Sequence, residues 1–162
     1  WLARPRVIAE SESNGLRLTS FEGLDRRIAA DQLTLSENPS IFGDAGVVLV
    51  TVKSADTADI AGVIARHAPH DAVIVSLQNG IGNVGVLRER LPGRIVLGGM
   101  VPFNVISAGQ GRFHRSTSGD IVIEADEAAT AARLSVPGLK PVSYTHPRAH
   151  ETVLDLGCRL LL

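Results

Sequence analysis

Three short runs of apolar, mostly β-branched residues predict the buried strands of this chain. They occupy residues 47–52 (VVLVTV), 72–77 (AVIVSL) and 94–99 (RIVLGG). A continuous apolar run of this length is typical of a strand that is covered on both faces, as in a parallel sheet. We therefore expect these three runs to be buried strands of a largely parallel sheet.

The segments between these strands have the spacing of helices. In residues 54–69 apolar side chains recur at intervals of three and four, and Pro69 ends the segment. Residues 82–93 predict a shorter helix that stops at a Pro-Gly pair. Two right-handed crossovers in succession make half of a doubly wound, mostly parallel sheet, so we predict the α/β class.

The flanking segments are less regular. Residues 15–36 show the alternation of strands with one exposed face. Residues 111–124 predict a hairpin that turns at Ser118-Gly119, and residues 126–135 predict a helix.

Composition narrows the class of protein. The 162 residues are 44% hydrophobic with a formal net charge of -1, which fits a single globular domain and indicates neither a nucleic-acid nor a membrane partner. Cys158 is the single cysteine, so we expect no internal disulfide, no metal site and a reducing, cytoplasmic setting.

Two polar residues follow predicted strands directly. Lys53 ends the first strand and is one of only two lysines among 16 basic residues, while Asn79 comes just after the second strand and precedes Gly80. Ligands of open parallel sheets bind outside the carboxyl ends of the strands. We therefore expect Lys53 and Asn79 at one rim, with Gly80 and Gly82 allowing a close backbone approach or a positive φ.

Each of these residues also has an interpretation without a ligand. Asn-Gly is a common turn pair, in which Asn79 would adopt a left-handed conformation. A lysine after a strand is more often a solvated end.

The motifs around these residues resemble a known family. The segments VVLVTVKSADT (47–57), VSLQNGIGN (75–83) and the run from residue 96 to residue 124, in this order and spacing, are similar to the N-terminal domain of ketopantoate reductase. The resemblance covers residues 1–140. It implies a partial Rossmann-type, NADP-binding domain.

The resemblance also implies the roles of four residues. Arg4, in LARP, matches the arginine that meets the 2′-phosphate of NADPH, and a guanidinium pairs with phosphate through two parallel hydrogen bonds. Lys53 and Gly80 match cofactor-binding positions. Asn79 matches an asparagine that contacts the cofactor and orients the substrate. The implied reaction is the NADPH-dependent reduction of 2-dehydropantoate, a small keto acid, to (R)-pantoate on the way to pantothenate and coenzyme A.

Several parts of the family pattern are not found in the chain. We expect the first strand with its glycine-rich turn, and the helical C-terminal domain with its catalytic lysine, to be missing, and we expect residues 141–162 to be a tail foreign to the domain. Lys140 precedes Pro141, which is incompatible with an undisturbed helix, so we assign no catalytic residue. The expectation is thus an inactive fragment of an enzyme; a reductase of another 2-keto acid, or a nucleotide-binding module without chemistry, remain alternatives.

Overall fold

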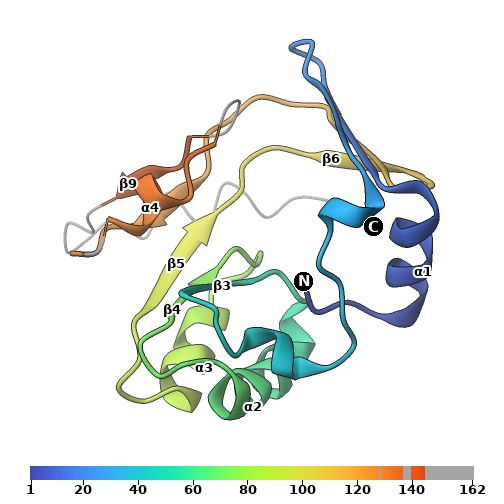
Figure 1. Ribbon diagram of the computed structural model, residues 1–162. Helices are drawn as coiled ribbons and strands as arrows, with labels where there is room; N and C mark the ends of the chain where they lie inside the picture. The colour runs from blue at the N-terminus through green and yellow to red at the C-terminus, as the bar shows by residue number, and fades with distance from the viewer. Residues whose placement is uncertain (128, 137–139, 145–162) are drawn as a thin grey trace. The chain divides into compact units, whose positions relative to one another are not determined.

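The three predicted strands form one side of a five-stranded sheet, and the first of them lies at its edge. The structure is a computed structural model that describes residues 1–127, 129–136 and 140–144. Strands β3 (Val47–Val50), β4 (Val73–Ser76) and β5 (Val96–Met100) lie parallel, in that order (Figure 1). Strand β8 (Val122–Glu124) is antiparallel to β5, and β9 (Val142–Tyr144) is parallel to β8. The predicted α/β class with a mostly parallel sheet is confirmed.

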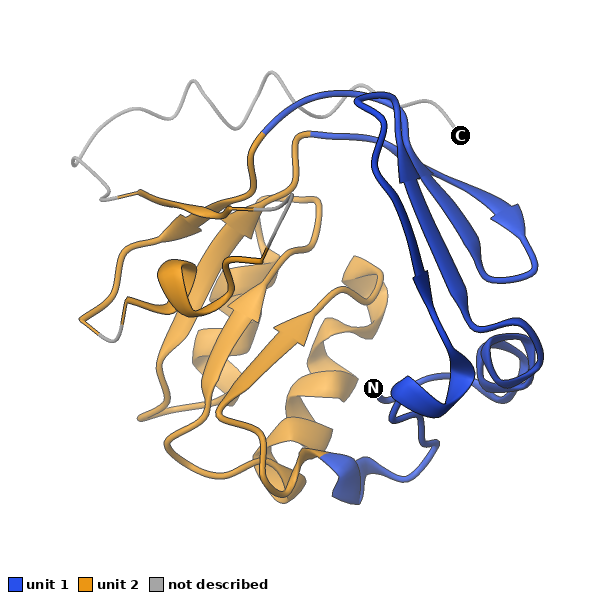
Figure 2. Ribbon diagram, turned by 45° about the horizontal axis from the view of Figure 1, so that its top comes forward, with its two compact units in different colours: residues 1–41, 103–119 blue, residues 42–102, 120–162 orange. Residues whose placement is uncertain are grey.

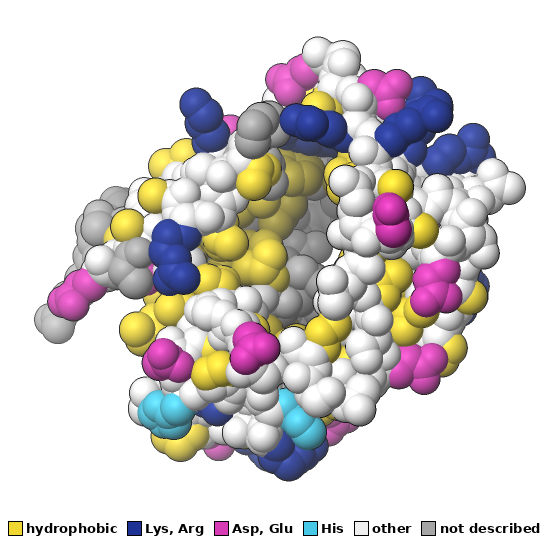
Figure 3. Space-filling model, viewed as in Figure 1, with side chains coloured by type: hydrophobic (Ala, Val, Ile, Leu, Met, Phe, Trp, Pro, Cys, Tyr) yellow, Lys and Arg dark blue, Asp and Glu magenta, His cyan; other side chains and the backbone are white. Residues whose placement is uncertain are grey.

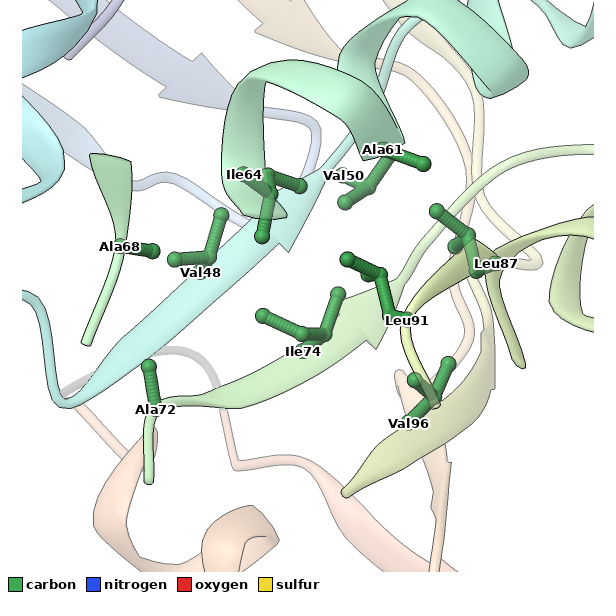
Figure 4. Close-up of a cluster of buried hydrophobic side chains, with 10 residues drawn as sticks. All are labelled: Val48, Val50, Ala61, Ile64, Ala68, Ala72, Ile74, Leu87, Leu91 and Val96. Carbon is green, nitrogen blue, oxygen red and sulfur yellow. The ribbon is translucent and has the colours of Figure 1, made fainter. Parts of the chain in front are cut away.

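Two helices connect the parallel strands and bury one face of the sheet. A 3-10 turn, η3 (Ser54–Asp56), leads into α2 (Thr57–His67), and α3 (Asn83–Arg90) follows β4. Figure 4 shows Ile64 of α2 and Leu87 of α3 on the side of the sheet where Val48 and Ile74 lie. Ile64, Ile74 and Leu87 are 0% exposed, and burial of one such side chain contributes about 1.5 to 3 kcal/mol.

Arg94 secures the end of α2. Its guanidinium donates hydrogen bonds to the carbonyl oxygens of Pro69 (2.7 Å), Ala68 (3.1 Å) and Ala65 (3.2 Å). The last carbonyl groups of a helix have no partner within the helix, and a cation also interacts favourably with this end of the helix dipole. The helix and the start of β5 are therefore joined at this point.

A second, four-stranded sheet belongs to another compact unit. It contains β1 (Leu16–Ser20), β2 (Asp25–Ile28), β6 (Val105–Gly109) and β7 (Arg112–Arg115), in the order β2-β1-β7-β6. This unit also holds α1 (Pro5–Asn14) and η1 (Ala30–Gln32). It is built from residues 1–41 and 103–119, and the other unit from the rest of the chain, where η2 (Pro39–Phe42) spans the junction (Figure 2). The extent of the domain, residues 1–140, remains a prediction.

The predicted hairpin at residues 111–124 is wrong. Strand β7 pairs with β6 across the turn of Gly109, Gln110 and Gly111, all three with a positive φ, whereas β8 pairs with β5 in the other sheet. Gly119 does mark a change of direction, with φ of 135°. The two strands that flank it, however, join different sheets.

One C-terminal segment differs from expectation, and the extent of the expected tail remains a prediction. The helix expected over residues 126–135 is a single turn, α4 (Thr130–Arg133). Residues 142–144, assigned to a foreign tail, form β9 beside β8, and residues 145–162 of that tail lie outside the described residues.

Within the described part of the chain, every helix is too short or too polar to cross a bilayer.

Candidate functional site

The loops that follow β3 and β4 lie against each other. The Ser54 hydroxyl donates a hydrogen bond to the Asn79 carbonyl oxygen over 3.2 Å, and the Gln78 amide donates to the Val52 carbonyl oxygen over 2.9 Å. Because β3 and β4 are parallel neighbours, both loops leave the same edge of the sheet. The structure therefore brings the segments that carry Lys53 and Asn79 to one rim, as the strand pattern predicts.

The rim is open to solvent at the predicted positions. Lys53, Asn79 and Gly80 are all exposed. Gly80 has φ of 107°, a backbone conformation that only glycine adopts readily. Gly82 has φ of -91° and begins α3 as its N-cap, so the expected positive φ belongs to Gly80 alone of the two glycines.

The interpretation of Asn79 as a left-handed turn residue is wrong. Among the described residues, the non-glycine positions with a positive φ are Gln110 and Ala129. Asn79 is absent from that group, and its neighbour Gly80 takes the left-handed geometry instead. The asparagine side chain is therefore not explained by the backbone conformation of its own turn.

Arg4 lies in the other unit, at the N-terminus of α1. It is the N-cap residue, with φ of -72° and ψ of 152°, and Pro5 follows as the first helical residue. The first turn carries Arg6 and no acidic side chain. The N-terminal end of a helix has a partial positive charge, so this helix end, with its arginines, suits an anion such as a phosphate.

Three polar side chains behind the rim were not predicted as site residues. Asn83 is 5% exposed and Thr57 is 1% exposed, and both are hydrogen-bonded together with the half-buried Gln78. The sequence does contain a signal for them, because Gln78 and Asn83 bracket the Asn79–Gly82 turn. Sequence alone does not indicate that such amides point inward.

The charge around the described surface has no single sign. The face in Figure 3 carries lysine or arginine side chains and aspartate or glutamate side chains, with hydrophobic side chains between them. This distribution agrees with the formal net charge of -1. A surface of this kind has no broad electrostatic field of one sign.

Comparisons with known proteins agree on one family. The sequence pattern described as "Ketopantoate reductase PanE/ApbA" matches residues 1–127. A curated 2-dehydropantoate 2-reductase from Halobacterium salinarum is 30% identical over 142 residues, which make up 83% of this chain and 46% of that protein.

Solved structures give the same result for the fold. A PanE/ApbA family ketopantoate reductase from Ralstonia eutropha superposes with a TM-score of 0.77 at 28% identity, over 96% of this chain and 49% of its own. A 2-dehydropantoate 2-reductase from Geobacter metallireducens has the same fold, with a TM-score of 0.74 at 23% identity, over 88% of this chain and 48% of its own. The chain spans about half the length of the relatives it matches. By the match over residues 1–127, this chain belongs to the ketopantoate reductase family.

Proposed function

We propose that this chain is the NADP-binding part of a 2-dehydropantoate 2-reductase, which reduces 2-dehydropantoate to (R)-pantoate with NADPH for the synthesis of pantothenate and coenzyme A. The observation that carries the proposal is the joining of the β3 and β4 loops, which gathers Lys53, Asn79 and Gly80 at one exposed rim. Family membership supplies the reaction, and the curated relative carries the same enzyme name.

The residues present fit a phosphorylated dinucleotide. In this proposal Arg4 pairs with the 2′-phosphate, because its guanidinium and the positive end of α1 both favour a doubly charged anion. At the rim, the exposed backbone of Gly80 has no side chain to keep a ligand away. Lys53 supplies a cationic donor, and Asn79 supplies both a donor and an acceptor for cofactor and keto acid.

The chemistry divides between cofactor and protein. NADPH supplies the hydride when it is bound. Asn79 and Lys53 orient the ketone relative to the cofactor. A hydrogen-bond donor near the ketone oxygen stabilises the negative charge that develops on that oxygen. We assign no proton donor to the described residues.

Cys158, the single cysteine, fits a reducing compartment, and we place the protein in the cytoplasm.

Arg4→Ala tests the choice of cofactor. We expect it to weaken NADPH binding by about 1 to 3 kcal/mol, or about 5- to 150-fold, because a charge-assisted hydrogen bond to phosphate is lost. NADH, which lacks that phosphate, should bind as before. The assay is a fluorescence titration of each cofactor, with Arg6→Ala as the matched control. Equal losses for both cofactors would contradict the assigned role of Arg4.

Asn79→Ala tests the rim. In a full-length protein that carries this chain, turnover of 2-dehydropantoate should fall more than the stability of the fold, since Asn79 is exposed. Steady-state kinetics and thermal unfolding on the same preparation separate these effects. A variant that melts early yet turns over normally would return Asn79 to a structural role. Binding of NADPH without reduction of any 2-keto acid would indicate the nucleotide-binding module instead.

A further inference from the structure

A buried amide, Asn83, joins three segments behind the rim. This first residue of α3 accepts a hydrogen bond at Oδ1 from the Thr57 hydroxyl over 3.1 Å. Its Nδ2 donates to the Asn79 carbonyl oxygen over 2.9 Å and to Ser54 Oγ over 3.1 Å. A single side chain thus connects the start of α2, the loop after β3 and the loop after β4.

A second amide, Gln78, extends the same network. Its Nε2 donates to the Val52 carbonyl oxygen over 2.9 Å and to the Thr57 hydroxyl over 2.8 Å, and its Oε1 accepts from Ser76 over 3.0 Å. Each group in this chain donates a hydrogen bond to the next: Gln78 to Thr57, and Thr57 to Asn83. Asn83 in turn donates to the Asn79 carbonyl oxygen. Hydrogen bonds in such a chain polarise and strengthen one another.

The network holds the residues on either side of the two rim side chains. Lys53 lies between Val52 and Ser54, which are both bonded to an amide of the network. The Asn79 carbonyl accepts two hydrogen bonds, from Asn83 and Ser54, so the peptide that joins it to the next residue has a fixed orientation. An apolar residue in place of either amide would leave partners such as the Thr57 hydroxyl and the Asn79 carbonyl without these hydrogen bonds.

We propose that Asn83 and Gln78 are positioning residues, which fix the backbone on both sides of Lys53 and Asn79 and so set the geometry of the cofactor-binding rim. This inference rests on the proposed function. It assigns no contact with the cofactor to either amide. Their effect on binding passes through Asn79 and Lys53, and that dependence distinguishes positioning from a general contribution to stability.

The first readout needs no ligand. In the full 162-residue chain, Asn83→Leu should lower the NMR order parameters of the Lys53 and Asn79 backbone amides from about 0.85 to below about 0.6. Val84→Ala is the matched control, because it removes packing from the next residue of the same helix and leaves the network intact. Ser54→Ala covers the case in which Asn83→Leu does not fold, since Ser54 is exposed and its loss removes two of these hydrogen bonds.

The second readout is a double-mutant cycle on NADPH affinity. Asn83→Leu should weaken binding about tenfold when Lys53 and Asn79 are both present, and much less when both of these residues are replaced by alanine. A full loss in both backgrounds, or rim order parameters that match those of Val84→Ala, would overturn the inference while the proposed function stands. Failure of a full-length protein that carries this chain to bind NADPH counts against the proposed function instead, and the order parameters still decide whether the amides fix the rim.

Discussion

The positive φ of Gly80 makes a quantitative prediction about the rim. Gly80→Ala places a side chain on a backbone with φ of 107°, where non-glycine residues are strained by about 1 to 3 kcal/mol. The new Cβ would lie 3.4 Å from Asn83 Nδ2 and 3.5 Å from Ser54 Oγ, so steric overlap adds little. Loss of freedom in the unfolded chain offsets about 0.4 to 1 kcal/mol. The centres of these two ranges, about 2 and about 0.7 kcal/mol, leave an expected net loss of stability of about 1.3 kcal/mol.

Two other glycines of the same segment serve as controls. Gly82 has φ of -91°, and no atom lies within 4 Å of a Cβ built there, so Gly82→Ala should change stability little. Gly85 lies inside α3 in open space, where alanine is favoured over glycine by about 1 kcal/mol. The same substitution should thus destabilise at Gly80 and stabilise at Gly85.

Urea unfolding at equilibrium measures these differences. With a denaturant slope of about 2 kcal/mol/M, a loss of about 1.3 kcal/mol moves the midpoint by roughly 0.65 M at an unchanged slope. A midpoint for Gly80→Ala equal to that of Gly82→Ala would refute the reasoning. It would mean that the turn relaxes to a conformation that alanine accepts, and the fixed orientation of the Asn79–Gly80 peptide would be lost with it.

Two further predictions concern ion pairs. The Glu124 carboxylate accepts hydrogen bonds from the Gly98 backbone N-H (2.6 Å) and from Arg88 (2.7 Å). Glu124→Gln should therefore lower the free energy of unfolding by about 1 to 2 kcal/mol, as measured by thermal unfolding. The control, Glu89→Gln, changes an exposed residue and should leave it unchanged. The Arg17 guanidinium donates two hydrogen bonds to Asp25 and lowers the pKa of that carboxyl. The stability from this pair is present above the ordinary carboxyl pKa and is lost as pH falls through the lowered value. An NMR titration of Asp25 should show the pKa rise in Arg17→Met; an unchanged pKa would refute the pairing.

The central part of the fold was predictable because its signals are local. The apolar runs that became β3, β4 and β5 are continuous and are separated by segments with helical spacing. Within the predicted helical segment, residues 54–56 form a 3-10 turn and α2 begins at Thr57. Helix boundaries depend on tertiary context, which a periodic pattern does not contain.

The sequence pattern did not predict which strands pair with each other. The Ser118-Gly119 pair is a sound local turn signal, but which strand pairs with which depends on contacts far apart in the chain. For the site, the rim residues Lys53 and Asn79 follow from their place at strand ends. The amides of Gln78 and Asn83 do not, because their inward direction is decided by Thr57, more than twenty positions earlier.

The two sheets impose different orders of assembly on the growing chain. The buried cluster under β3, β4 and β5 comes from one unbroken stretch, from Val48 to Val96, so it gathers soon after synthesis of that stretch. Strand β1 instead pairs with β7, and the Thr19–His114 contact between them joins positions 95 residues apart. Such distant pairing forms late, because the intervening chain must first be closed into a loop. During translation, β1 of the β1–β2 hairpin therefore has one edge without its partner strand. At this edge the nascent chain can pair wrongly with strands of other chains.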